Sequence, residues 1–182
     1  MPHHARRTFL TAIVAALLLL VVSVAPAAAG LRTEQTTGPE SFRGFILTSG
    51  ATGQRQVVAT GIVAKGVFTG VGRIVEVPNG PGDPDSVSRD DLVFRTGTAH
   101  LVTVNESFTF SINPVTCIFK ATVEQTSTIA GGTGVFANAS GTFDASVHAT
   151  GLAARAPDGS CSDQVVPLHE LDVVMGTGSL TL

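Results

Sequence analysis

Hydrophobic and polar residues alternate with a period of two along most of the chain after residue 30, and no window there shows the apolar spacing of an amphipathic helix. The alternation is clearest in Thr116–Ile129, where one face carries Cys117, Phe119, Ala121, Val123 and Ile129. Successive side chains of a strand point to opposite faces, so this pattern predicts a strand with one buried and one solvated face. The sequence therefore predicts an all-β domain.

Similar alternation in other segments predicts about eight strands. A closed sheet has no unpaired edges, and glycines inside the predicted strands permit the coiling that closure needs, so we favour a single antiparallel β-barrel over a sandwich. The predicted strands are Phe42–Thr48, Gln54–Lys65, Val67–Val77, Leu92–Val104, Ser107–Ile112, Thr116–Ile129, Thr142–Thr150 and Val165–Met175, with Gly178–Leu182 as an extra edge.

Two segments lack the alternation. Pro78–Asp91 is rich in proline, glycine, asparagine and aspartate, and it predicts a long mobile loop that joins no ladder. Ala154–Asp163 is a second irregular stretch, which a bond through Cys161 would tether to the predicted strand that carries Cys117.

The first 29 residues have the parts of a secretory signal peptide. Arg6 and Arg7 precede an apolar run over Ala12–Val22, and small residues end at Ala29. A retained membrane anchor is the alternative, but the run is short for a span of about 20 residues. The sequence predicts cleavage after Ala29, one mature domain over residues 30–182, and secretion to the medium or the cell envelope.

Composition narrows the function. Loss of Arg6 and Arg7 changes the formal net charge from −3 to −5, and the remaining basic residues are scattered, which argues against nucleic acid and anionic membranes as partners. The chain has ten phenylalanines but no tyrosine or tryptophan, so phenol-based proton transfer is excluded.

Cys117 and Cys161 are the two cysteines. An exported protein meets an oxidising environment, so we predict a disulfide between them. A reactive thiol or a metal ligand is the alternative, but neither cysteine lies in a Cys-x-x-Cys or histidine-containing signature.

The segment from Gly131 to Gly141 is rich in glycine and holds one aromatic residue, Phe136. Its glycines permit positive φ in a tight turn, and Phe136 is expected to plug the core beside it. A phosphate cradle would need a helix directly afterwards and, in the P-loop type, a lysine, so we expect no nucleotide cofactor. The motif residues are Gly131, Gly132, Thr133, Gly134, Phe136, Ala139 and Gly141.

This motif resembles the turn and strand start of the dirigent proteins, the allene oxide cyclases and the secreted bacterial proteins that share their barrel. The resemblance implies a barrel with an apolar interior for small hydrophobic molecules, and self-association as in the dimeric or trimeric plant relatives. Dirigent proteins commonly have an arginine, and the cyclases a tyrosine, where this chain has Ser140; the cyclases have a glutamate where it has Ala137. The resemblance therefore does not imply inherited catalysis.

Two histidines lie on apolar faces of predicted strands: His100 with Val102 and Val104, and His169 with Leu171 and Val173. One interpretation turns either side chain into the barrel, where it would contact or protonate a ligand; the interpretation we favour is a histidine hydrogen-bonded within the core or rim. His148 shares a polar face and is expected to be solvated. The candidate ligand contacts are Phe94, His100, Phe119, Val123, Phe136 and His169.

Other chemistry has weaker support. No Gly-x-Ser-x-Gly pentad marks a serine hydrolase, and the loop aspartates lack the spacing of a calcium loop, so we expect no metal. The carboxylates are interpreted as surface groups, although they are numerous enough for an acid–base pair. They are Asp83, Asp85, Asp90, Asp91, Glu106, Glu124, Glu170 and Asp172.

The leading hypothesis is a secreted, non-enzymatic barrel that binds a small hydrophobic molecule. The second is a cyclase or isomerase acting on such a molecule, with His100 and His169 handling protons. The third is a structural or interaction protein of the envelope whose barrel is filled with side chains.

Overall fold

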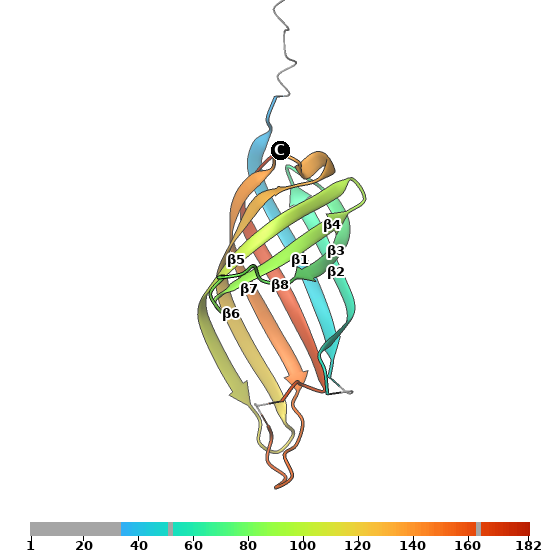
Figure 1. The fold of residues 1–182 in the computed structure, drawn as a ribbon, viewed down its shortest axis with the longest axis vertical. Helices are drawn as coiled ribbons and strands as arrows, with labels where there is room; N and C mark the ends of the chain where they lie inside the picture. Colours follow the sequence, from blue (N-terminus) through green and yellow to red (C-terminus); the bar gives the residue numbers. More distant parts are fainter. Residues whose placement is uncertain (1–33, 51–52, 163–164) are drawn as a thin grey trace, which may run out of the picture. The chain divides into compact units, whose positions relative to one another are not determined.

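The structure is a computed structural model that describes residues 34–50, 53–162 and 165–182. The predicted signal peptide lies outside the described residues. Residues 34–182 form one compact unit of eight antiparallel strands, each paired with the next, and β8 returns to pair with β1 (Figure 1). The strands are β1 (Thr37–Ser49), β2 (Gln56–Gly66), β3 (Gly70–Val77), β4 (Val87–Phe94), β5 (Gly97–Ile112), β6 (Ile118–Gly132), β7 (Ser140–Leu152) and β8 (His169–Thr181). The predicted all-β closed barrel is confirmed.

Several predicted strand boundaries were wrong. Leu92–Val104 spans two strands, because β4 and β5 are joined by a tight turn at Arg95 and Thr96 that lacks the usual turn residues. Ser107–Ile112 is the far end of β5, and Gly178 lies inside β8 rather than on an extra edge. The predicted loop Pro78–Asp91 is also too long, since β4 begins at Val87 and pairs with both neighbours.

One end of the barrel is closed by aromatic side chains. A 3-10 turn, η1 (Gly134–Phe136), follows β6 and places Phe136, which is fully buried, against Phe68 with ring centroids 4.8 Å apart. Gly131 and Gly134 have positive φ, as the motif predicted, and a Cβ on Gly134 would lie 2.1 Å from the carbonyl oxygen of Thr96. The glycine-rich motif is therefore a tight turn that seats Phe136 as a plug.

The opposite end is open and longer on one side. β5 continues to Ile112, whereas its neighbour β4 begins at Val87, so β5, β6, β7, β8 and β1 extend beyond the short strands (Figure 1). A register shift between Asn105 and Ser107 turns Phe108 to the same face as Val123. Val123 in turn pairs with Val147, whose side chain faces the barrel interior.

A disulfide joins Cys117 to Cys161 at this open end, with Cα atoms 5.3 Å apart, and this confirms the predicted bond. It ties the chain before β6 to the irregular segment after β7, where Arg155 forms an isolated bridge with Cys161. Among the described residues, no helix is long and apolar enough to cross a membrane.

Candidate functional site

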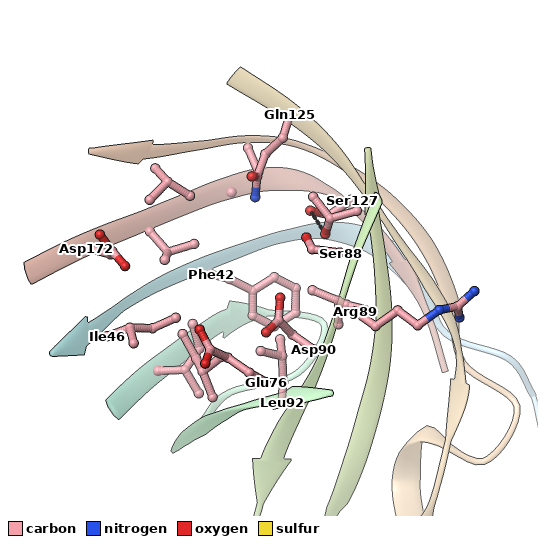
Figure 2. Close-up of a pocket in the computed structure, with 18 of the residues that line it drawn as sticks. Phe42, Ile46, Glu76, Ser88, Arg89, Asp90, Leu92, Gln125, Ser127 and Asp172 are labelled. Carbon is pink, nitrogen blue, oxygen red and sulfur yellow. Dashed lines mark hydrogen bonds between the residues drawn. The ribbon is translucent and has the colours of Figure 1, made fainter. Parts of the chain in front are cut away.

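A cavity of about 320 Å³ lies inside the barrel and is lined by residues of all eight strands (Figure 2). Alternation along each strand turns every second side chain inward, and these inward positions are mostly apolar. The apolar wall consists of Phe42, Ile46, Ile62, Ile74, Leu92, Leu101, Phe143, Val147 and Val174.

Two small residues leave room in this wall. Gly176 on β8 pairs with Phe42 on one side and with Ala145 on the other, and both Gly176 and Ala145 line the cavity. A Cβ on Gly176 would make only an ordinary contact, 3.5 Å from the Cβ of Ala145. The interior is therefore not filled by side chains, which counts against the filled-barrel hypothesis.

A pair of hydroxyls interrupts the apolar wall. Thr103 and Ser127 are only 2% and 4% exposed, and their side-chain oxygens are hydrogen-bonded to each other at 2.8 Å. Each hydroxyl has one O–H to donate, and the bond between them uses one of the two. No other hydrogen bond from either hydroxyl is formed among the described residues, so one O–H remains for a molecule in the cavity.

Three carboxylates line the cavity toward its open end: Glu76 on β3, Asp90 on β4 and Asp172 on β8 (Figure 2). On each strand the carboxylate lies nearer the open end than the apolar neighbour Ile74, Leu92 or Val174 does. The guanidinium of Arg55 donates two hydrogen bonds to the Glu76 carboxylate, with nitrogen–oxygen distances of 2.6 and 2.7 Å. Among the described residues, neither aspartate forms a hydrogen bond or an ion pair.

Burial controls the ionisation of both aspartates. It raises the pKa of Asp90 to about 6, and the nearby charges of Glu76 and Asp91 act in the same direction against the smaller opposing effect of Arg55. Burial likewise raises the pKa of Asp172 to about 6, with Glu170 as the next cause. A carboxyl with a pKa near 6 is mostly ionised at neutral pH and can also accept and release protons there.

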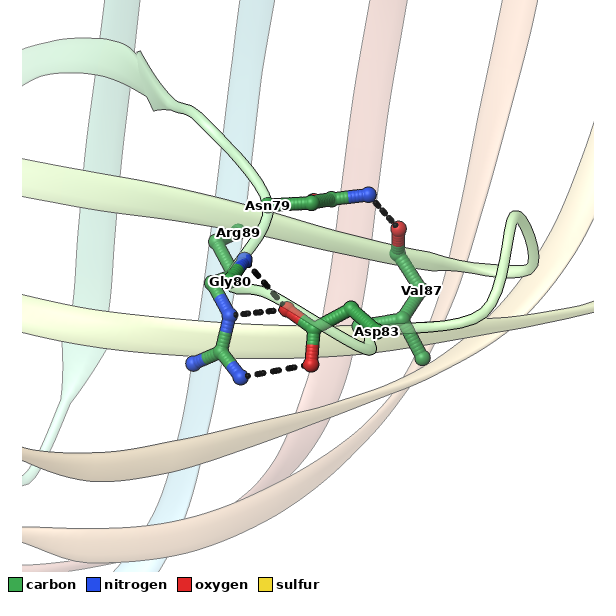
Figure 3. A network of polar contacts seen from close by, with 5 residues as sticks. All are labelled: Asn79, Gly80, Asp83, Val87 and Arg89. Atoms are coloured by element: carbon green, nitrogen blue, oxygen red, sulfur yellow. Dashed lines mark hydrogen bonds and ion pairs between the residues drawn. The ribbon is translucent and has the colours of Figure 1, made fainter.

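The segment between β3 and β4 borders the cavity and is held by polar contacts (Figure 3). Arg89 donates two hydrogen bonds to Asp83, at 2.7 and 3.0 Å, and the Gly80 N–H donates to the same carboxylate. The Asn79 amide donates to the carbonyl oxygen of Val87. These bonds fix the start of β4, whose inward residues are Ser88, Asp90 and Leu92.

The structure corrects the predicted orientation of both histidines. His100 is exposed on the outer face, with Nδ1 2.6 Å from Asp91 Oδ1, because Ala99 and Thr103 occupy the inward positions of β5. His169 is exposed at the start of β8, on the outer face with Leu171 and Val173. His148 is also exposed, as expected.

The other predicted contacts are apolar and face inward, but none lines the cavity. Phe94 and Phe136 belong to the plug, with ring centroids 5.6 Å apart. Phe119 is buried beside Cys117 in a separate cluster near the disulfide, and Val123 lies on the inner face beyond the cavity. Among the described residues, no three acidic, histidine or cysteine side chains converge as metal ligands would.

The carboxylates were missed because they had been interpreted as loop or surface groups. On β8 the alternating set Leu171, Val173 and Met175 is more apolar than the set of Asp172, Val174 and Gly176, yet the second set faces the cavity. A weak signal existed in the two residues that continue this second set, Gly178 and the buried Leu180.

Fold and cavity together define an all-β barrel with an interior cavity large enough for a small molecule. No protein-family model matches the chain, and neither a curated protein nor a solved structure shows a significant match to it.

Proposed function

We propose that the protein is an exported barrel that binds one small hydrophobic molecule in its interior without changing it chemically. The main observation in support is the cavity of about 320 Å³, whose walls are predominantly aliphatic and aromatic. Pockets for small ligands measure about 300–1,000 Å³ and combine apolar walls with a few polar groups. An eight-stranded barrel is just wide enough to hold one such ligand when small residues stand in place of large ones, as Gly176 and Ala145 do here.

Export is part of the proposal, and the bond between Cys117 and Cys161 supports it because disulfides persist in oxidising compartments. Kinship with the allene oxide cyclase and dirigent barrels also stays a proposal. It is supported by the closed antiparallel barrel and by the place of the glycine-rich motif at its plugged end.

The test is mass spectrometry of the organic extract from protein purified in native form from its own source, with a mock purification as blank. We expect a small molecule in stoichiometric amount. Gly176→Leu should remove it, since the first added carbon fits and the rest of the side chain extends into the cavity. Thr177→Leu adds leucine to the exposed outer face of the same strand and is the matched control. Equal amounts of ligand in both variants, or an empty wild-type extract at full recovery, would contradict the proposal.

An enzyme of the cyclase or isomerase type is the second candidate, and the raised pKa values of Asp90 and Asp172 favour it. The version that used His100 and His169 lacks support, because both lie outside the cavity. In an enzyme, the extracted molecule would be converted to a product by fresh protein, and Asp90→Asn or Asp172→Asn would abolish the conversion. A carrier returns the same molecule unchanged.

A further inference from the structure

We propose that the molecule bound in this cavity is a cationic amphiphile, with an apolar body inside the barrel and a protonated amine at the open end beside Asp90 and Asp172. This inference rests on the proposed function and specifies the class of ligand.

The charge balance at the open end is the first observation. Three carboxylates line the cavity, whereas the guanidinium of Arg55 is already engaged by one of them, Glu76. Arg89, the basic residue among the lining residues, is bound to Asp83. Among the described residues, Asp90 and Asp172 thus form no ion pair of their own, and Arg55 acts on them only through its charge; a partly buried carboxylate without a close partner is costly. A ligand amine would provide that partner, whereas an anionic ligand would add repulsion.

The apolar wall argues for an organic cation rather than a metal ion. Magnesium and calcium need several oxygen ligands that converge on one point, and the described residues contain no such group. The aliphatic and aromatic lining instead favours a hydrocarbon body behind the charge.

The hydroxyls of Thr103 and Ser127 form a second polar site in the cavity wall, apart from the carboxylates. Thr103 and Ser127 are more than nine-tenths buried, lie on β5 and β6, and line the same cavity. Their remaining O–H can be donated to an acceptor atom on the ligand body. The wall therefore offers a donor on β5 and β6, and negative charge on β3, β4 and β8.

The test uses three probes with one ring system: 1-naphthylmethylamine, 1-naphthalenemethanol and 1-naphthoic acid, which are a cation, a neutral molecule and an anion at neutral pH. Because the chain has no tryptophan or tyrosine, naphthalene fluorescence can be followed in the intact mature protein without masking. We expect the amine to bind about 10-fold or more tightly than the alcohol, and the acid to bind most weakly.

Asp90→Asn and Asp172→Asn should each weaken amine binding by about 10-fold and leave alcohol binding unchanged. Asp144→Asn is the matched control, because Asp144 is exposed on β7 outside this cavity and should alter none of the three affinities. Two separate aspartate variants keep the test decisive if one of them folds poorly, which thermal unfolding would reveal.

The outcomes separate the two proposals. Alcohol and amine binding with equal affinity would overturn the cationic inference and leave the carrier proposal standing. Tighter binding of the acid would overturn the inference as well. Binding of none of the probes, with wild type and Gly176→Leu behaving alike, would contradict the carrier proposal itself.

Discussion

The plugged end and the open end of the barrel differ in their inward residues, which are mostly aromatic at the first, apart from the buried Glu40, and acidic at the second. At the plugged end, Phe68 packs edge to face against both Phe94 and Phe136, and glycines of the connecting turns let backbone segments approach closely. At the open end, the inward positions carry Asp90 and Asp172.

The aromatic residues at the two ends differ as well. Phe136 is fully buried, whereas Phe108, on the inner face of the extended part of β5, is 65% exposed. Buried aromatic contacts stabilise a fold, while uncompensated charge and exposed apolar surface do not, and such groups are retained where function needs them. The comparison suggests that one end holds the barrel together and the other binds.

The largest effect should come from the plug. Phe136→Ala removes a fully buried ring and leaves a cavity beside Phe68 and Phe94. We therefore expect a loss of about 3–5 kcal/mol in the free energy of unfolding. Phe108→Ala, the matched change at the open end, should cost below about 1 kcal/mol because that ring is mostly exposed. Urea denaturation measures both, and equal losses would break the contrast between the ends.

The open end depends on a covalent bond where the plugged end depends on packing. Replacing Cys117 and Cys161 by alanine opens a loop of sequence separation 44 and should lower the free energy of unfolding by roughly 3–4 kcal/mol in the chain-entropy model. Ligand binding should survive in the folded fraction, since neither cysteine lines the cavity. A variant that unfolds at the same urea concentration as the wild type would show that the bond does not stabilise the barrel.

A pair of glycines gives a third comparison. Gly134 in the plug turn has a φ of 58°, and an added Cβ would collide with the Thr96 carbonyl oxygen, so Gly134→Ala should cost at least about 2 kcal/mol. Gly176→Ala, at the cavity wall, meets its nearest atom at 3.5 Å and should change the free energy of unfolding by less than about 0.5 kcal/mol. The result is checked by thermal unfolding, and a larger loss in Gly176→Ala would indicate that the cavity wall is not open space.

The same contrast explains what could be predicted from the sequence. The plug follows local rules: glycines adopt positive φ in a turn and an aromatic residue fills the core. The disulfide at the open end is predicted from the two cysteines and the expected export. These features, and the all-β barrel that follows from period-two alternation, are predictable from the sequence.

The cavity depends on which of two alternating faces turns inward, and composition does not settle that question. On β5 and β8 the outer face is itself apolar, with Val104 and Val173 exposed, so His100 and His169 seemed to lie on the inner one. Asp90 was placed in the predicted loop Pro78–Asp91 because that segment is rich in proline, glycine, asparagine and aspartate. The functional residues were thus missed because they depart from the rules that predicted the rest of the fold.

Asp90 should change the free energy of unfolding less than Phe136, the disulfide or Gly134 does, and the size of its effect depends on pH. The folded-state pKa, about 6, exceeds the ordinary value of 3.8, so the folded protein retains a proton that the unfolded chain releases as the pH rises between these values. The free energy of unfolding should therefore fall over this range and stay lowered above it. Because asparagine does not ionise, Asp90→Asn should be more stable than the wild type at about pH 7.5, by on the order of 1–2 kcal/mol once solvent screening is allowed for, and should differ little at about pH 3.5.

Urea denaturation at the two pH values checks this, with the exposed Asp144→Asn as the control that should show no such difference. Amine binding should change in the opposite sense, weakening as the pH falls through about 6 while alcohol binding stays constant, because protonation removes the charge of Asp90 and Asp172. The charged groups that act on these two aspartates are Glu76, Asp91, Glu170 and Arg55, and of these only Arg55 opposes the rise in their pKa. If Asp90→Asn were less stable than the wild type at the higher pH, the carboxylate would have to make a favourable contact in the folded protein, and the open end would be a stabilising region like the plug.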